Sequence, residues 1–330
     1  MRIAVIGAGS WGTTVASLAA RNTTTVLWAR NESVADEINS AHTNCAYLPG
    51  FDLPEVLEAT HELADAIRGA ELVVMGVPSH GFRQVITALA GHLDDAVPVV
   101  SLTKGVEQGT NARMTEILRE LLPHNPIGVL SGPNLAKEVM AGHPTGAVIA
   151  MTDQRVAERV QAAISSPGFR VYSNTDVIGA ELGGAFKNVI AIAAGMVDGM
   201  GFGDNTKATL ITRGLSELAR LGAKLGGKVL TFGGLAGLGD LIATCSSQQS
   251  RNRFVGEGLG RGRALVDITS EMKMVAEGVK SCGPVHEIAI ANGLELPIVE
   301  QVTRVVRDGV TAVEALESLL ARPATSELFA

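Results

Sequence analysis

The chain has 330 residues, of which 46% are hydrophobic and 18% are charged, so it is long enough for two globular domains and too apolar to be disordered. Its net charge is −7 and it has no block of lysine or arginine, which argues against a nucleic-acid or membrane-surface partner. The three cysteines, Cys45, Cys245 and Cys282, form neither a disulfide framework nor a CxxC motif. Together with an N-terminus that lacks signal-peptide features, this cysteine usage predicts a cytoplasmic protein.

The first half of the chain alternates β-type runs with helical patterns. Several of the runs are continuous in Val, Ile and Leu, as is typical of strands buried on both faces. The predicted strands are Arg2–Ile6, Thr25–Trp28, Leu72–Val77, Val97–Thr103, Gly128–Leu130, Ala147–Met151 and Arg170–Tyr172. The predicted helices are Trp11–Arg21, Gly81–His92, Ala112–Leu121 and Arg155–Ser165. This alternation predicts an α/β domain with a parallel, doubly wound sheet.

The strand signal stops near Thr175, and only helical patterns follow. They are Val177–Met200, Lys207–Leu225, Leu235–Thr244, Met272–Asn292, Val299–Asp308 and Ala312–Ala321, the last preceded by Thr311 and Glu314 in capping-box spacing. We therefore expect an α/β domain over residues 1–175 and a helical domain over residues 176–330. The most apolar stretch, from Leu182 to Val197, contains Lys187 and Asn188, which favours a buried core helix over a membrane span. The helical domain could carry a homodimer surface, although no residue pattern identifies one.

A glycine-rich motif, Gly7-Ala8-Gly9-Ser10-Trp11-Gly12, directly follows the first predicted strand and opens a helix. This context makes GxGxxG a dinucleotide-binding fingerprint of a Rossmann-like domain. Gly7 permits the tight turn, Gly9 lets the backbone approach a pyrophosphate, and Gly12 lets helix and strand pack closely. The N–H groups and the dipole at the helix start then attract the phosphates.

The end of the second predicted strand bears on the choice between NAD and NADP. An acidic residue there typically holds the ribose 2′-hydroxyl, whereas an arginine accommodates a 2′-phosphate. Here the strand is followed by Arg30, and Glu32 comes late, so NADP or dual use is favoured. The alternative is that Arg30 is a solvated loop charge.

Lys187 is the only charged residue between Glu181 and Asp198, in a pattern apolar on every face. A helix of this kind is buried, and tight packing would offset the helical glycines Gly183, Gly184 and Gly195. Desolvation lowers the pKa of an ammonium, which would suit Lys187 to acid–base catalysis of carbonyl–alcohol hydride transfer. The alternative is a lysine that snorkels to water.

Other polar residues lie where an anionic substrate could bind. Lys104 closes a predicted strand at the edge that lines the binding crevice of such sheets, and Gly132 follows another strand as a turn signal. Asp240 stands in an apolar run and would share a helix face with Thr244. Ser250-Arg251-Asn252-Arg253 could open a helix and hold a phosphate, or could be an ordinary cap beside solvated arginines. The seven histidines show no metal-binding spacing, so no metal is predicted.

Seven blocks in order along the chain resemble the bacterial-type NAD(P)-dependent glycerol-3-phosphate dehydrogenases. They are GAGSWGT from Gly7, SLTKGVE from Ser101, SGPNLAKEV from Ser131, ELGGAFKNVIAIAAGMVDG from Glu181, GFGDNTKATLITRGLSE from Gly201, GLAGLGDLIATCSSQQSRNRFVG from Gly234 and MVAEGVKS from Met274. The resemblance implies a Rossmann-like domain followed by a helical domain like that of 6-phosphogluconate dehydrogenase. It also implies interconversion of dihydroxyacetone phosphate and sn-glycerol 3-phosphate with NADH or NADPH, which feeds glycerophospholipid synthesis.

The resemblance assigns roles to individual residues. Lys187 matches the proton donor and acceptor, and Lys104 matches a contact to both coenzyme and substrate. Coenzyme contacts are implied for Ser10, Trp11, Arg30, Ala136, Arg251, Val275 and Glu277. Substrate contacts are implied for Gly132, Asn134, Lys187, Asp240, Ser250, Arg251 and Asn252. At Asn134 the chain departs from the family, which more often has Thr or Ser after Gly-Pro.

Three other functions compete with this interpretation. A hydroxyacid or hydroxyacyl dehydrogenase would share the two-domain plan but would need no compact phosphate site at Ser250–Asn252. A non-catalytic NAD(P)H sensor would not need a buried lysine as a proton donor. Thiol catalysis through Cys245 would need an activating neighbour, and no histidine lies nearby in sequence.

Overall fold

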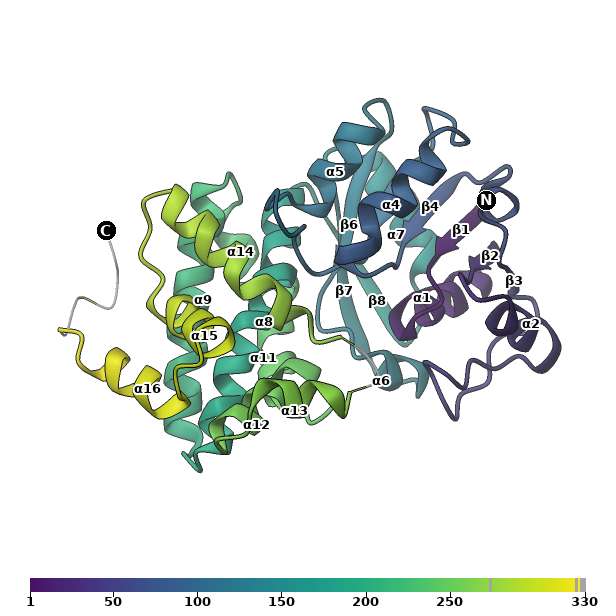
Figure 1. Ribbon diagram of the computed structural model, residues 1–330. Coiled ribbons are helices and arrows are strands. Elements are labelled where there is room, and N and C mark those ends of the chain that lie inside the picture. Colours follow the sequence, from purple (N-terminus) through teal and green to yellow (C-terminus); the bar gives the residue numbers. More distant parts are fainter. Residues whose placement is uncertain (273–274, 324–325, 327–330) are drawn as a thin grey trace. The chain divides into compact units, whose positions relative to one another are not determined.

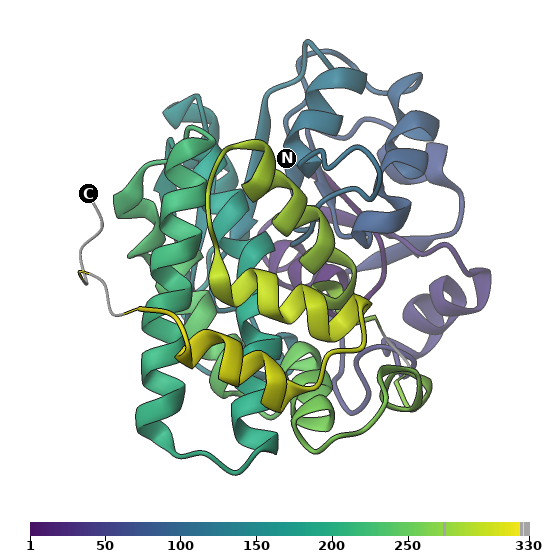
Figure 2. The same ribbon diagram turned by 60° about the vertical axis from the view of Figure 1, so that its left-hand side comes forward.

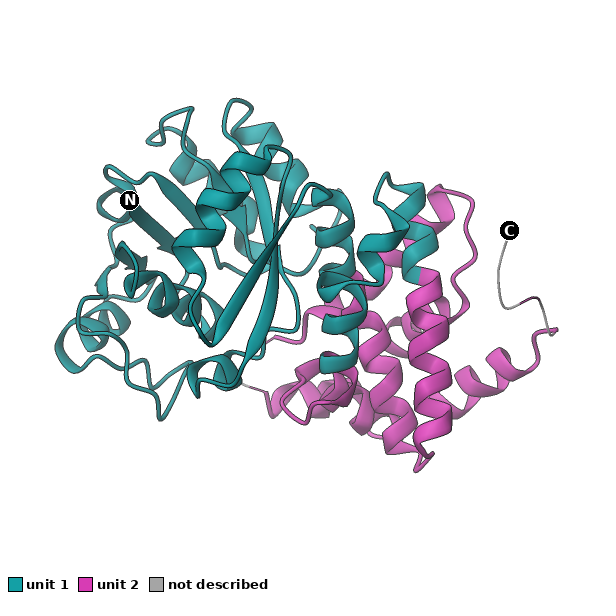
Figure 3. Ribbon diagram, turned by 180° about the vertical axis from the view of Figure 1, so that it is seen from behind, with its two compact units in different colours: residues 1–185, 218–243 teal, residues 186–217, 244–330 magenta. Residues whose placement is uncertain are grey.

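The computed structural model describes residues 1–272, 275–323 and 326 (Figure 1). The chain divides into two compact units, one of residues 1–185 and 218–243 and the other of residues 186–217 and 244–330 (Figure 3). The borders fall inside three helices, α8 (Val177–Gly199), α9 (Asp204–Lys224) and α11 (Asp240–Ser246). The division at residues 175 and 176 stays a prediction from the sequence.

The described part of the first unit contains one eight-stranded sheet in the order β3-β2-β1-β4-β5-β6-β7-β8. Its strands are β1 Arg2–Ile6, β2 Thr24–Trp28, β3 Glu58–Thr60, β4 Leu72–Met75, β5 Val99–Ser101, β6 Ile127–Ser131, β7 Thr145–Met151 and β8 Phe169–Asn174. All seven predicted strands are confirmed. The eighth, β3, lies at the edge and has only Ala59 as an apolar residue, so it gives no hydrophobic signal.

Helices cover both faces of this sheet, as the doubly wound prediction requires. In β1 the side chains alternate: Ile3 and Val5 belong to one apolar cluster, while Ala4 and Ile6 belong to another. The first cluster takes in α1 (Ser10–Ala20), α2 (Glu32–Ala41) and α7 (Gln154–Ile164). The second takes in α3 (Leu63–Ile67), α4 (Ser79–Ala90) and α5 (Met114–Leu121). The strands are therefore buried on both sides, which explains their continuous apolar sequences.

One pair of strands departs from the predicted parallel sheet. β7 runs antiparallel to β6, with Gly128 opposite Met151 and Ser131 opposite Val148, whereas every other described neighbour pair is parallel. The predicted parallel, doubly wound sheet is therefore confirmed for every described neighbour pair except this one. The connection between the two strands contains only the five-residue helix α6 (Ala136–Met140), and a parallel crossover usually needs a longer helix.

After residue 175 all described secondary-structure elements are helices, as predicted, and Figure 2 shows several of them side by side. Besides α8, α9 and α11 they are α10 Val229–Phe232, a π-helical turn Leu235–Gly239, α12 Arg251–Gly260, α13 Leu265–Ser270, α14 Glu277–Ala291, α15 Pro297–Arg307 and α16 Ala312–Leu320. The predicted helix Leu235–Thr244 is thus a π-helical turn followed by α11. The predicted start of α14 near Met272 is wrong, since it begins at Glu277, and residues 273–274 lie outside the described residues. The capping box of Thr311 and Glu314 is confirmed.

The glycines of α8 allow other backbone segments to approach closely. A Cβ at Gly183 would lie 2.6 Å from the Ala236 carbonyl oxygen, within the first unit. In the second unit, a Cβ at Gly195 would lie 2.1 Å from the Arg253 carbonyl oxygen of α12. In return, a Cβ at Gly256 of α12 would lie 1.9 Å from the Ile192 carbonyl oxygen. The predicted tight packing around these glycines is confirmed.

Two helical stretches of the described chain are long and apolar enough to cross a membrane, namely Val177–Gly199 and Val229–Ser246. Of the apolar window in the first, 94% is buried inside the protein, as in a core helix. The second is divided among α10, the π-helical turn and α11. Neither stretch is therefore good evidence for a membrane span.

We expect Gly195→Ala to lower the stability of the protein, because the added methyl group would meet backbone atoms of α12 that cannot move away independently. Overpacking of this kind costs roughly 1–3 kcal/mol. Gly81→Ala in α4 is the matched control, since a Cβ there meets nothing within 4 Å and alanine favours a helix by up to about 1 kcal/mol. Thermal unfolding should show a lower Tm for Gly195→Ala alone, and an unchanged Tm would contradict the packing argument.

Candidate active site

The glycine-rich turn has the geometry that its motif predicts. Gly7 has φ +118°, a conformation that favours glycine, and a Cβ at Gly12 would lie 2.0 Å from the Gly7 carbonyl oxygen. At Gly9, by contrast, a Cβ would meet nothing within 4 Å. Gly9 is also the N-cap of α1, so no capping side chain occupies the N–H groups of the first turn. Open space and helix N–H groups occur together here, and they fit a pyrophosphate.

Ser10 and Trp11, the next two predicted coenzyme contacts, follow directly. The Ser10 hydroxyl donates to the Tyr47 carbonyl at 2.5 Å. The Trp11 ring lies 6.0 Å from the Phe169 ring between centroids, and its buried Nε1 has no hydrogen-bond partner among the described residues. A buried indole N–H usually has an acceptor, so this atom fits a bound polar ligand.

The positions of Arg30 and Ala136 give no evidence that these residues contact a coenzyme. Arg30 is exposed after β2, next to Asn31, whose side chain caps α2 by accepting from the Ser33 amide. Ala136 is the first residue of α6 and is half-buried. Neither position decides between a coenzyme contact and an ordinary surface residue.

Three of the predicted substrate residues, Lys104, Gly132 and Asp240, are in contact within the first unit. Its ammonium donates to the Gly132 carbonyl at 2.9 Å and to the Asp240 carboxylate at 2.7 Å. Asp240 is almost completely buried, and this ion pair explains why an acidic residue stands in an apolar run. The sequence identified all three residues but gave no reason to expect that they would be in contact.

Gly184 of α8 lies at the same place. A Cβ at Gly184 would lie 2.7 Å from the Ser131 hydroxyl oxygen and 3.4 Å from Cγ of Lys104. The Ser131 hydroxyl is buried and has no hydrogen-bond partner among the described residues, and the same holds for Oδ1 of Asn134. The Asn134 amide nitrogen donates to the Gly146 carbonyl at 3.4 Å. Two unsatisfied oxygens beside a lysine fit a hydroxylated ligand.

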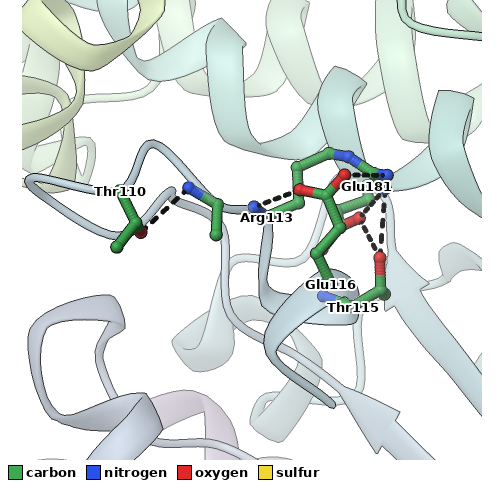
Figure 4. A network of polar contacts seen from close by, with 6 residues as sticks. Thr110, Arg113, Thr115, Glu116 and Glu181 are labelled. Carbon is green, nitrogen blue, oxygen red and sulfur yellow. Dashed lines mark hydrogen bonds and ion pairs between the residues drawn. The ribbon is translucent and has the colours of Figure 1, made fainter. Parts of the chain in front are cut away.

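One buried and one partly buried ion pair hold the segment that follows Lys104. The Glu181 carboxylate of α8 accepts from Arg113 at 2.7 Å and from the Thr115 amide at 2.8 Å and hydroxyl at 2.5 Å (Figure 4). At the other end of the segment, the Glu107 carboxylate accepts from the Arg83 guanidinium at 2.8 and 2.9 Å. This contact lowers the pKa of Glu107. The polypeptide after Lys104 is therefore tied to α8 and to α4.

Lys187 lies in the second unit and is only 6% exposed. Its ammonium donates to the Thr244 hydroxyl. The alternative of a lysine that snorkels to water is therefore wrong. The sequence pointed to Thr244 only as a neighbour of Asp240 on α11, and it did not predict the contact with Lys187.

The predicted phosphate cluster forms the start of α12. Ser250 is the N-cap and accepts from the Arg253 amide at 3.2 Å. The Asn252 side chain donates to Asn188 and accepts from the Gly278 amide, both at 2.9 Å, so it links α12 to α8 and α14. This link was not predicted from the sequence. In the structure, Ser250 and Asn252 have structural partners in addition to their predicted roles.

Arg251 is exposed as a residue, although desolvation of its guanidinium lowers its pKa and the charge of Glu277 opposes that shift. Glu277 begins α14, and Val275 precedes it with 38% of its surface exposed. Arg251 and Glu277 thus interact electrostatically within the second unit. No ligand role for Val275 follows from its position alone.

Comparison with known proteins shows which family the chain resembles. Residues 2–157 match the family described as NAD-dependent glycerol-3-phosphate dehydrogenase N-terminus, and residues 176–317 match the corresponding C-terminus. Glycerol-3-phosphate dehydrogenase [NAD(P)+] 2 of Sphingopyxis alaskensis is 49% identical over 97% of this chain and 96% of its own length. Glycerol-3-phosphate dehydrogenase [NAD(P)+] of Mycobacterium avium is 51% identical over 97% of this chain and 94% of its own length.

A solved structure gives the same result at the level of the fold. The crystal structure of glycerol-3-phosphate dehydrogenase from Coxiella burnetii superimposes with a TM-score of 0.93 at 38% identity, and the match covers 97% of this chain and 99% of that one. The similarity in sequence and in structure therefore extends over nearly the whole chain. The chain belongs to the NAD(P)-dependent glycerol-3-phosphate dehydrogenase family.

Proposed function

We propose that the protein interconverts dihydroxyacetone phosphate and sn-glycerol 3-phosphate with NAD(P)H. The observation that carries the proposal is the buried ammonium of Lys187 with its hydroxyl partner Thr244, in a chain that matches this family nearly end to end. A buried ammonium is expensive unless it is paired, and it is well suited to proton transfer. The predicted roles of the individual residues are part of this proposal.

The reduced coenzyme supplies the hydride that adds to the central carbon of the ketone. Lys187 gives a proton to the oxygen of that carbon as negative charge develops on it, and it regains the proton from solvent. Thr244 keeps the ammonium oriented. In the reverse direction the neutral amine of Lys187 accepts the hydroxyl proton.

Lys104 and Asp240 orient the hydroxyl end of the triose in this proposal, because they present a donor and an acceptor held against each other at 2.7 Å. Gly132 and Asn134 border the same polar contact through the Lys104–Gly132 hydrogen bond and the unsatisfied Asn134 oxygen. The substrate phosphate is assigned to Arg251 and to the N–H groups at the start of α12, where Ser250 and Asn252 fix the backbone. Arg251, Val275 and Glu277 are assigned to the coenzyme as well.

The substrate assignment can be tested with the purified protein and a panel of ketones. Dihydroxyacetone phosphate should be reduced, whereas unphosphorylated dihydroxyacetone and 2-keto acids should be reduced at least about a hundredfold less well, because a site built to bind a charged group rejects analogues that lack it. Absorbance of NADH or NADPH gives the rate. Preference for a 2-keto acid would refute the proposed substrate and would favour the hydroxyacid dehydrogenase alternative.

Lys187→Ala should lower kcat by about 10²–10⁴-fold, the usual contribution of a general acid or base. Coenzyme binding should change little, and it can be followed by nicotinamide fluorescence. Lys224→Ala is a suitable control, because Lys224 is also a helical lysine but is exposed in the last turn of α9. Near-normal turnover by a folded Lys187→Ala protein would show that Lys187 is not the proton donor.

Arg30→Ala should raise the KM for NADPH about tenfold or more and leave the KM for NADH within about twofold. The reason is that only NADPH carries a 2′-phosphate, and a charge-assisted hydrogen bond contributes about 1.5–3 kcal/mol. Initial rates with each coenzyme would measure both constants. Equal changes in the KM for NADPH and the KM for NADH would show that Arg30 does not bind the 2′-phosphate.

We also propose that the enzyme works in the cytoplasm and supplies glycerophospholipid synthesis. All three cysteines are free, which suits a reducing compartment. A homodimer stays a prediction.

A further inference from the structure

Asn44 is a completely buried residue in the segment between α2 and β3, outside the glycine-rich motif. Its side-chain nitrogen donates to the Ala8 carbonyl and to the Thr13 hydroxyl, each at 2.9 Å. Its side-chain oxygen accepts from the Tyr47 amide at 3.3 Å. Both N–H groups and the oxygen of this amide are therefore used, and two of the three contacts are to the coenzyme turn and its helix.

The contact with Ala8 has a consequence for the next residue. In a planar trans peptide unit the carbonyl of one residue and the N–H of the next point in opposite directions. When Asn44 holds the Ala8 oxygen from the protein interior, the Gly9 N–H is directed the other way. Among the three glycines of the motif, only Gly9 has open space at its Cβ position. An N–H directed away from the protein interior at this position is available to a pyrophosphate.

Asn44 is itself held firmly in place. The Leu48 amide donates to the Asn44 carbonyl at 2.7 Å, and the Ser10 hydroxyl donates to the Tyr47 carbonyl at 2.5 Å. From the other side, the Glu37 carboxylate of α2 accepts from the Thr43 hydroxyl and the Cys45 amide, each at 2.8 Å. The segment around Asn44 is therefore anchored to both α1 and α2.

We propose that Asn44 is a positioning residue for the coenzyme, which fixes the Ala8–Gly9 peptide so that the Gly9 N–H donates to the pyrophosphate. Without this anchor the peptide unit could rotate, and a phosphate would meet a carbonyl oxygen in place of a donor. The inference rests on NAD(P) binding by the family and is independent of the identity of the triose. It can therefore be tested without turnover.

The test compares Asn44→Ala with Asn125→Ala in the full-length protein. Asn125 is also buried and donates two hydrogen bonds to carbonyls, those of Asp94 and Val97 at 2.8 Å, at the amino ends of the strands and away from the glycine turn. Both variants should lose stability, which thermal unfolding measures. Only Asn44→Ala should raise the Kd of NADPH and NADH, by about tenfold or more, in a fluorescence titration without substrate.

The kinetic signature should be specific as well. With dihydroxyacetone phosphate, Asn44→Ala should raise the KM for the coenzyme and keep kcat near its normal value at saturating coenzyme. Thr13→Val should stay within about threefold of the normal Kd, because it removes the second acceptor and leaves the bond to Ala8 intact. If only the turnover assays fail, the substrate proposal is wrong and the binding comparison still stands.

A normal Kd for a folded Asn44→Ala protein would overturn the inference, as would an equal loss of affinity in Asn125→Ala. If Asn44→Ala does not fold, Asn44→Asp replaces it. That variant keeps the oxygen that accepts from Tyr47 and turns a second oxygen toward the Ala8 carbonyl, so it should weaken coenzyme binding at least as much. A normal Kd for Asn44→Asp would equally refute the role.

Discussion

Close contact along the backbone of α8 is the constraint on which the chemistry depends. Within the first unit, Gly184 leaves room for the Ser131 hydroxyl and lies close to the Lys104 side chain. Within the second unit, Gly195 and Gly256 let α8 and α12 lie against each other. Glycine is poor in helices by about 1 kcal/mol per residue, so these positions are maintained by what packs against them. The same apolar, tightly packed helix is what removes Lys187 from water.

The two lysines illustrate different uses of a charge in a protein interior. Lys104 is paired with a buried carboxylate and a carbonyl, so it serves as a fixed electrostatic element that can orient a ligand. Lys187 is buried in the second unit and donates to the Thr244 hydroxyl. These surroundings fit the proposed positioning role of Lys104 and the proposed proton-transfer role of Lys187.

Much of the fold could be predicted because burial on both faces produces continuous apolar strands, as in β1 and β4. The sequence analysis did not predict β3, α2, α3 or α6. The strand β3 and the helices α3 and α6 are only three to five residues long, and α2 buries only Val34, Ala35 and Ile38. For the site, charged residues in apolar surroundings, such as Lys187 and Asp240, were visible in the sequence. Their contacts were not, because the Lys187–Thr244 hydrogen bond and the Lys104–Asp240 ion pair join residues that lie far apart in the chain. Asn44 and Ser131 were not identified either, since they are ordinary polar residues whose surroundings come from distant parts of the chain.

The reversal of chain direction at β7 decides where α8 points. β7 and β8 run antiparallel to the other strands. The C-terminus of β8 therefore lies at the same end of the sheet as the N-termini of β1 to β6. The next helix, α8, therefore runs along the sheet, in contact with Val129 and Val148, toward the end at which β1 to β6 finish. It arrives there at Gly184, beside the last residue of β6 and the lysine after β5. Had β7 and β8 followed the direction of their neighbours, the same helix would start at the ligand-binding rim and lead away from it.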